Sequence, residues 1–475
     1  MTDHPTSCEE NAPILESVSS GTKTFRRRWA LLLMLAVLQT INSFNFSGFG
    51  QASSVYQAYF HVPYPAIDWL TLSSFAGVCL FSPLLAWLSY ADITRLRKLI
   101  ITAATLMCFA YLCTVISVAV EKHFVFPVMV FGQLCNGITA SILVSTPAVF
   151  ADIWFPDHEI GTAIGGNLFG ISAGLLLGFL LPVNILATPP FGSIRPVIYS
   201  KNHSNTSAAW YEEDHFSLTV MYAVFLVISM STLVLVVTFF VDEPLLPPSQ
   251  AQLVKRQNER SKKEDPTITT FFKQTTMLFN DRIFVLSALV LGVVFHINSL
   301  EFTMLNEIIA NILNRNNQAT EYSNHTSGYI MSLFSVGGLF GSFVAGKIMD
   351  NYKRYEVQAR IGIFVVLFSN FGLLFALFFR YIIGFYICNA IFGFSARISM
   401  TALFEILTLQ AYSMKESFVS AWGTCIQAGL GIIFAELGRY SILCCYNVED
   451  VYNKGVYDLY ALTSDVNRDE FAFAS

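Results

Sequence analysis

The chain has 475 residues, of which 54% are hydrophobic and only 13% are charged, and its net charge is −5. The charged fraction is about half of the roughly 25% that is usual in soluble domains. This composition excludes a disordered chain, a nucleic-acid binder and an ordinary cytosolic enzyme. It favours a protein that crosses a membrane several times.

Long apolar stretches follow one another along the whole chain. A membrane-spanning helix needs about 20 mainly apolar residues. Eleven segments meet this condition: 29–50, 67–88, 99–120, 125–150, 162–186, 216–240, 283–310, 328–349, 360–379, 382–411 and 418–443. Most of the 28 Lys and Arg residues fall in segments that lie on the inside if the N-terminus is inside. The positive-inside rule therefore predicts a cytoplasmic N-terminus.

Three glycosylation sequons agree with this orientation. They begin at Asn202, Asn205 and Asn324, in the two connections 187–215 and 311–327, which are both predicted outside. Glycans are added to Asn-X-Ser/Thr only on the outer or luminal side. We therefore expect all three asparagines to be modified.

The longest predicted cytoplasmic connection follows the sixth span and divides the chain into two parts. Six spans, a long charged segment and further spans are typical of the major facilitator fold, whose two helix bundles are related by a two-fold axis along the membrane normal. We predict an all-α membrane protein with a tail at 1–28, a six-helix bundle at 29–241, a linker at 242–282, a second bundle at 283–443 and an acidic tail at 444–475. The chain after Cys445 contains no twelfth apolar run, and both a true absence and an alternative transcript would explain this.

A short motif recurs at the cytoplasmic end of two predicted spans. The eighth span ends with Gly346 to Arg354, which includes Asp350, and the second ends with Ala86 to Arg95, which includes Asp92. Both stretches resemble the facilitator motif in which an Asp and basic residues close the inner gate. The resemblance implies a gating role for Asp350.

Several further stretches resemble the feline leukaemia virus subgroup C receptor family, solute carrier family 49. The matching residues are Ala66 to Leu70, Gly132-Gln133, Pro147, Ile153 to Phe155, Glu159, Thr162-Ala163, Gly178 to Pro182, Gly341-Ser342, Asp350 to Tyr355, Phe404-Glu405, Tyr412 and Glu416. The resemblance implies a carrier of choline, ethanolamine, haem or a related cargo. It covers roughly residues 26–440.

The family's choline pocket is only partly kept here. Its aromatic wall, a Trp in the choline carriers, falls on Phe46, which can still hold a quaternary ammonium by cation–π attraction. Two other pocket positions, a Gln and a Tyr in the family, fall on Ser172 and Ser299. A second Gln falls on Ala428, or on Gln427 if the register shifts by one. The resemblance therefore implies the family's fold with an altered cargo.

Charged residues inside predicted spans are costly and usually functional. Arg397, where the family has a small polar residue, either meets an anionic group of the cargo or pairs with Glu301 or Glu405. Glu301 would either bind the cargo by neutralising a cationic group or take up a proton. In the second case a His296/Glu301 pair would couple transport to protons, although His296 also fits a role in helix packing. Glu405 matches a family Glu, which implies an inner-gate ion pair.

We predict a secondary transporter of a small organic solute that works by alternating access, not an enzyme, because no catalytic or nucleotide-binding motif occurs. No cofactor, metal or nucleic acid is expected, and we expect a monomer in a lipid bilayer. One alternative is a lysosomal proton-coupled exporter of a vitamin-like solute such as pyridoxine, since Glu9 to Leu15 resembles an acidic dileucine signal. Another is a transport-inactive interaction or receptor protein. We place the protein in the plasma membrane, with the lysosomal membrane as the alternative.

Overall fold

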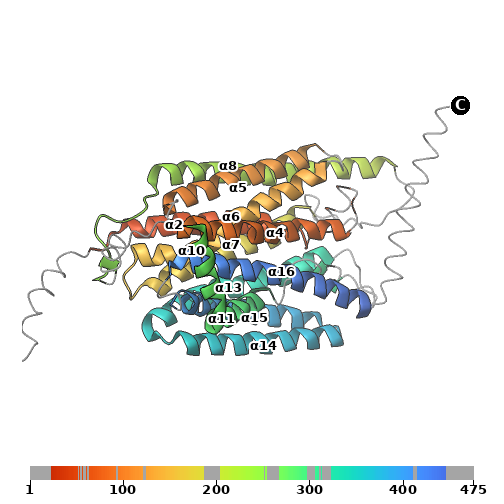
Figure 1. The fold of residues 1–475 in the computed structure, drawn as a ribbon. Coiled ribbons are helices and arrows are strands. Elements are labelled where there is room, and N and C mark those ends of the chain that lie inside the picture. Colours follow the sequence, from red (N-terminus) through yellow and green to blue (C-terminus); the bar gives the residue numbers. More distant parts are fainter. Residues whose placement is uncertain are drawn as a thin grey trace, which may run out of the picture.

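The computed structural model shows an all-helical protein (Figure 1). It describes residues 23–51, 64–91, 95–120, 125–186, 204–250, 267–296, 323–409 and 414–445, together with scattered residues in 53–62, 252–253 and 305–312. No strand occurs among these residues. The predicted all-α fold class is therefore confirmed.

The first half of the chain supplies six long helices. They are α2 (Arg27–Ser47), α4 (Tyr64–Tyr90), α5 (Leu96–Ala119), α6 (Phe126–Trp154), α7 (Ile160–Leu186) and α8 (Ser204–Phe239). Each is long and apolar enough to cross a membrane. The six predicted spans of this half are thus present as helices.

The second half supplies the remaining helices of the described chain. They are α10 (Ile268–Asn280), α11 (Arg282–His296), α13 (Ser323–Tyr352), α14 (Tyr355–Phe379), α15 (Ile382–Leu409) and α16 (Glu416–Cys445). The last four are long and apolar enough to span, and α10 with α11 forms one bent pair with an angle of 76°. Among the described residues this gives ten spans, or eleven when the bent pair is included.

Two helix boundaries differ from the sequence prediction. Helix α8 begins at Ser204, well before the predicted start at 216, so part of the predicted outer connection is helical. Helix α10 lies inside the predicted linker 242–282 and buries only Phe271 and Leu278. Its short amphipathic pattern is below the length of a spanning helix, and for that reason a search for spans alone does not find it.

The outermost helices face the surroundings with apolar side chains. In Figure 1, α8 and α14 lie on opposite flanks of the molecule. Helix α14 exposes a row of phenylalanines: Phe364, Phe368, Phe371 and Phe375. A soluble protein rarely exposes such a large apolar patch. In a bilayer the lipid tails cover it, so the surface fits a multi-pass membrane protein.

The two halves meet along two helix pairs, α7 with α13 and α4 with α16. Helices α7 and α13 approach very closely, since a Cβ atom built on Gly165 would lie 2.6 Å from the backbone oxygen of Ser342. Small residues allow such close backbone contact between membrane helices. We call these two pairs the α7/α13 seam and the α4/α16 seam.

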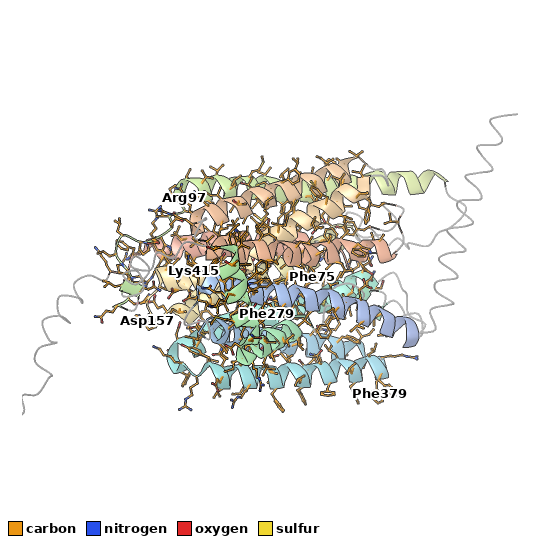
Figure 2. The ribbon with its side chains drawn as sticks, viewed as in Figure 1. Phe75, Arg97, Asp157, Phe279, Phe379 and Lys415 are labelled. Carbon is orange, nitrogen blue, oxygen red and sulfur yellow. The ribbon has the colours of Figure 1, made fainter. Side chains whose placement is uncertain are left out.

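Charge is concentrated at one end of the bundle. Arg97, Asp157 and Lys415 lie at one end, and Phe379 lies at the other (Figure 2). Helix α2 begins at the charged end, whereas α16 ends at the opposite one (Figure 1). We refer to the charged end as the basic end, which is the predicted cytoplasmic side.

The predicted glycosylation sites lie near the opposite end or outside the described residues. Asn202 lies outside them, and Asn205 lies in the first turn of α8. Asn324 lies in the first turn of α13, and its side chain is only 8% exposed. A glycan on Asn324 therefore requires modification before α13 packs, and all three sites stay predictions.

Candidate functional site

A central cavity of about 100 Å³ lies between the two halves. Both halves line it, through α2, α4, α6 and α7 from the first and α11, α13, α15 and α16 from the second. Its aromatic lining consists of Phe46, Phe75, Phe295, His296, Phe334 and Phe392. Its polar lining consists of Gln39, Asn42, Ser43, Ser74, Asn136, Arg397, Thr424 and Gln427.

The first half fixes its polar groups in an amide network. The Nε2 of Gln39 donates to Asn167 Oδ1 at 3.0 Å and to the Leu143 carbonyl at 2.9 Å. The Nδ2 of Asn42 donates to Asn136 Oδ1 at 2.8 Å. Buried amides that are paired in this way stay in place and are costly to disturb. This wall of the cavity is therefore preorganised.

Sequence reasoning missed this amide network. Gln39, Asn42 and Asn45 follow one another at intervals of three on α2, which places them on one side of the helix. The spacing is a signal that polar side chains face the interior of the bundle. In an apolar span, such a stripe predicts either helix contacts or a cavity wall.

A cluster of three aromatic rings connects the two halves across the cavity. The Phe46 and Phe75 rings are 5.3 Å apart, and the Phe75 ring meets the His296 ring edge-on at 4.6 Å. The predicted aromatic wall at Phe46 is therefore in the cavity. His296 is fully packed, because a Cβ on Gly431 of α16 would lie 2.7 Å from its Nδ1.

Among the described residues, His296 has no carboxylate within ion-pair distance, and its ring packs against aromatic and glycine neighbours. These contacts fit the helix-packing interpretation. Its suggested partner Glu301 and the neighbouring Ser299 lie outside the described residues. The proton-coupling role of His296 and Glu301, and the binding role of Ser299, stay predictions.

Arg397 lines the cavity from α15 and is only 3% exposed. Its Nε donates to Ser172 Oγ of α7 at 3.0 Å, and its Nη1 lies 3.6 Å from Met400 Sδ. Its guanidinium carbon lies 5.9 Å from the centre of the Phe295 ring. Ser172 itself is not among the residues that line the cavity. The structure therefore brings these two predicted residues together.

Gln427 of α16 also lines the cavity, and so does Ala428. The Gln427 Oε1 atom is buried without a hydrogen-bond partner. A buried acceptor without a partner costs about 1–3 kcal/mol. This oxygen is therefore available to a donor on a bound molecule.

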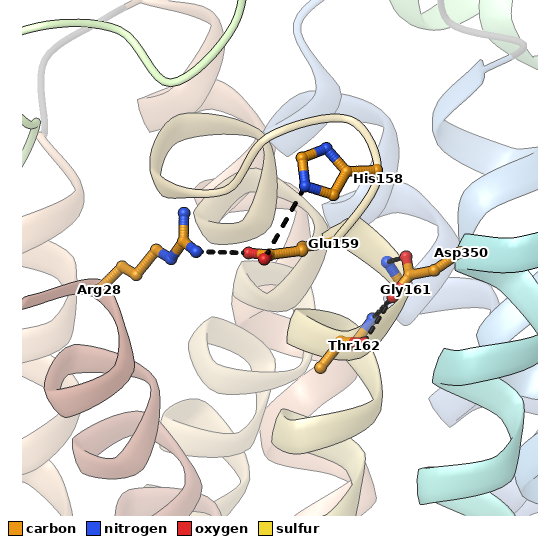
Figure 3. Close-up of polar contacts among 6 residues, drawn as sticks. All are labelled: Arg28, His158, Glu159, Gly161, Thr162 and Asp350. Carbon is orange, nitrogen blue, oxygen red and sulfur yellow. Dashed lines mark hydrogen bonds and ion pairs between the residues drawn. The ribbon is translucent and has the colours of Figure 1, made fainter. Parts of the chain in front are cut away.

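The residues predicted for the gate lie at the basic end, far from the cavity lining. Asp350, in the last turn of α13, reaches across to the first turn of α7 (Figure 3). Its Oδ1 accepts from the Gly161 N–H at 2.7 Å, and its Oδ2 accepts from the Thr162 N–H at 2.9 Å and the Thr162 hydroxyl at 2.5 Å. A carboxylate at a helix N-terminus also gains from the helix dipole. Asp350 thus clamps the two halves together, and we call this contact the Asp350 clamp.

An ion pair lies beside the Asp350 clamp. Arg28 of α2 lies 2.6 Å from Glu159, and its guanidinium also stacks near the Phe155 ring (Figure 3). This pair lies within the first half and shapes the turn that leads into α7. Glu405 is half-buried in the last turns of α15. Its gating role stays a prediction.

No group of three or more His, Cys, Asp or Glu side chains within the described ranges is arranged to hold a metal ion.

The sequence-family model of the Major Facilitator Superfamily matches residues 35–435 of the chain. The chain belongs to this superfamily. Its predicted fold and its character as a multi-pass membrane protein are thereby confirmed.

Individual relatives support the narrower resemblance. The human choline/ethanolamine transporter FLVCR2 is 25% identical over 370 residues, which cover 76% of this chain and 63% of the relative. The uncharacterized MFS-type transporter C09D4.1 of Caenorhabditis elegans is 27% identical over 357 residues, which cover 74% of this chain and 53% of the relative. The chain thus spans about half to two thirds of the length of these relatives. The expected resemblance to the feline leukaemia virus subgroup C receptor family is confirmed.

Solved structures agree on the fold. The E. coli fucose:proton symporter FucP superposes with a TM-score of 0.60 at 11% identity, over 88% of this chain and 93% of the symporter. At this identity the likeness concerns only the fold. It places the cavity between the two halves of a facilitator, where transporters of this type bind substrate.

Proposed function

We propose that the protein is a secondary transporter that carries a small organic solute across a membrane by alternating access. The observation that carries this proposal is the cavity between the halves, which both halves line with buried polar groups. Transporters of this architecture bind cargo between their halves and then open it to one side and to the other. No described residue group suggests catalysis, and we propose no enzymatic role.

The two seams give this mechanism a physical basis. At the basic end, the Asp350 clamp holds α13 to α7, and aromatic rings of α10 and α16 pack against the end of α4. The cavity opens to the predicted cytoplasm only when these contacts break. Each round of transport therefore requires the clamp to form and to release.

The cargo does not follow from the relatives alone. FLVCR2 is named a choline/ethanolamine transporter, but the cation-binding cage expected for such a cargo is altered here at Ser172 and Ala428, whereas Phe46 keeps an aromatic face. Choline- or ethanolamine-like solutes and haem are the cargo classes that the sequence predicts. Export of a vitamin-like solute from lysosomes, and an inactive interaction protein, are the alternatives. We place the carrier in the plasma membrane.

Flux measurement tests the proposal directly. We would express the chain in cells that lack endogenous carriers and follow labelled choline, ethanolamine, haem and pyridoxine at about pH 5.5 and about pH 7.4. We expect saturable flux of one solute above that of mock cells. Flux that depends on pH would support proton coupling. A protein that reaches the membrane and moves none of a broad solute panel would contradict the proposal.

A pair of variants connects flux to the cavity. Phe46→Ala removes a ring from the cavity wall, whereas Phe364→Ala removes a ring from the lipid-facing side of α14, where Phe364 is 71% exposed. We expect Phe46→Ala to raise the KM about tenfold, which corresponds to about 1.4 kcal/mol. Phe364→Ala should leave the KM unchanged. Equal effects of the two changes would argue against this cavity as the transport site.

A further inference from the structure

The charge of the central cavity points to a class of cargo. Arg397 is the charged residue of its described lining, which includes neither Asp nor Glu. The groups that contact Arg397 are the Ser172 hydroxyl, the Met400 sulfur and the face of the Phe295 ring. None of these carries a formal negative charge, so the described surroundings leave the guanidinium without a counterion.

A buried charge of this kind is costly. Removing a cation from water without a partner costs several kcal/mol, and proteins normally compensate it with an opposite charge. Within membrane spans an ionisable residue marks a substrate or ion pathway by default. Arg397 lies where a bound molecule can supply the missing charge. Its planar fork of N–H donors matches the two oxygens of a carboxylate.

The rest of the lining narrows the shape of such a molecule. Gln427 Oε1 is a buried acceptor without a partner, so it favours a ligand that also carries an N–H or O–H donor. The rings of Phe46, Phe75, Phe334 and Phe392 offer flat apolar surfaces to the body of the ligand. The amides of Gln39 and Asn42 are already engaged with protein partners.

We propose that the cavity binds a small organic anion, whose carboxylate pairs with Arg397 while an apolar, preferably flat body packs among the phenylalanine rings. A hydroxyl or amine on that body donates to Gln427. This inference rests on the proposed transport function and names its substrate class. The proposed cargo differs in charge from that of carriers of simple cations, because Arg397 repels a quaternary ammonium group in the same cavity.

A purely structural role of Arg397 makes a different prediction. The hydrogen bond from Arg397 to Ser172 links α15 to α7 and thus one half to the other. If this link is its only task, changing Arg397 alters the stability of the protein but not its preference among ligands. Ligand charge is therefore the variable to measure.

The test uses three probes of similar size with different charge on the full-length protein in detergent. Benzoate carries a carboxylate, benzamide is its neutral counterpart, and benzyltrimethylammonium is a cation. We expect calorimetry to show benzoate binding about 10- to 100-fold more tightly than benzamide, as charged hydrogen bonds predict. We expect benzyltrimethylammonium to bind more weakly than benzamide. Adding a donor, as in 4-hydroxybenzoate, should improve the affinity further.

Variants then assign the effect to Arg397. Arg397→Gln should reduce the preference for benzoate over benzamide to less than about threefold, and Arg397→Lys should retain part of it. Arg360→Gln is the matched control, because Arg360 lies on the surface in an exposed pair with Glu356. It should leave the preference unchanged. If Arg397→Gln does not fold, the probe series on the unmodified protein still decides whether the cavity prefers an anionic ligand.

The outcomes also separate this inference from the transport proposal. Equal binding of benzoate and benzamide, or preference for the cation, overturns the anion site even if the protein transports choline. Tight benzoate binding without flux of benzoate or of any other solute supports the anion site and contradicts transport. Flux of benzoate that disappears in Arg397→Gln supports both.

Discussion

The two seams between the halves differ in the atoms that make the contact. Along α7 and α13, backbone meets backbone: a Cβ on Gly165 would lie 2.6 Å from the Ser342 oxygen, and one on Gly346 would lie 2.7 Å from the Gly161 oxygen. Along α4 and α16, side chains fill the space, and a Cβ on Gly429 would meet only the Cys79 sulfur, at 3.9 Å. The α7/α13 seam is therefore tight, whereas side chains separate the backbones in the α4/α16 seam, which we call the cushioned seam.

The basic ends of the seams differ in the same way. The α7/α13 seam ends in the Asp350 clamp, in which one carboxylate accepts three hydrogen bonds. The α4/α16 seam ends in rings that meet edge-on, with the centre of the Phe271 ring of α10 lying 5.1 Å from that of Trp87 and 5.8 Å from that of Phe418. Directional bonds are lost abruptly as helices separate, whereas apolar contacts can slide. We therefore expect the α7/α13 seam to act as the latch of the proposed transport cycle.

Joining the cushioned seam covalently should have the largest effect. The Cys79 and Cys425 thiols each lie 3.7 Å from the other residue's backbone oxygen, across α4 and α16. Copper phenanthroline with oxygen would take two electrons and two protons from these thiols and form a disulfide. We expect the cross-linked fraction to lose all flux and dithiothreitol to restore it. Mass spectrometry of linked peptides measures the cross-link.

The control for this experiment is a single cysteine change. Cys425→Ala should abolish both the cross-link and the loss of flux, whereas Cys108→Ala, on α5, should abolish neither. Full transport by a protein that is quantitatively cross-linked would show that the α4/α16 seam stays closed throughout the cycle. The comparison of the seams would then fail.

Adding one methyl group to each seam compares them directly. Gly165→Ala places a Cβ against the backbone oxygen of Ser342, where overpacking costs about 1–3 kcal/mol. We expect flux to fall about tenfold and the unfolding temperature to drop. Gly429→Ala, the matched change in the cushioned seam, should stay within about twofold of the unmodified protein. Similar losses in both variants would remove the distinction between the seams.

Most of the fold could be predicted from the sequence, because membrane-spanning helices can be recognised by their length and apolar composition. Ten predicted spans correspond to long helices, and the seventh corresponds to α11 with further helical residues near 305–312. Helix α10 could not be found in this way. Its burial of Phe271 depends on rings supplied by α4 and α16, which is tertiary information.

The cavity was predicted only in part. Phe46, Arg397 and Gln427, which were predicted to bind the cargo, line it, whereas Ser172 does not. His296, which was predicted to act in proton coupling, lines it as well. The partners of Asp350 could not be predicted, since Gly161 and Thr162 offer mainly backbone N–H groups. Nothing in a sequence shows which distant helix end will meet a carboxylate.

The Asp350 clamp should respond moderately to loss of its charge. Asp350→Asn keeps the shape but leaves one acceptor oxygen for three donors and removes the interaction of the charge with the α7 N-terminus. We expect the closed state to lose about 1–2 kcal/mol, which is about 5- to 30-fold in its population. Labelling of Ser342→Cys from the basic end, in a cysteine-free background, measures this shift.

The control is Glu356→Gln, two residues into α14, because Glu356 pairs only with Arg360 on the exposed surface in the described contacts. Exposed ion pairs contribute little to stability. We expect its labelling rate to match that of the unmodified protein. If Asp350→Asn also matches, the α7/α13 seam is held by its glycine contacts alone and the clamp is not a latch.

Removing one polar group from the end of the cushioned seam should have the smallest effect. The Tyr90 hydroxyl donates to Thr270 Oγ1 at 2.7 Å near the protein surface, while its ring packs against Phe271 and Phe418. Tyr90→Phe deletes the hydrogen bond and keeps the ring, and water satisfies the exposed Thr270 hydroxyl. We therefore expect flux and labelling within about twofold of the unmodified protein. A loss as large as that of Asp350→Asn would mean that the α4/α16 seam, too, depends on directional bonds, and that both seams serve as latches.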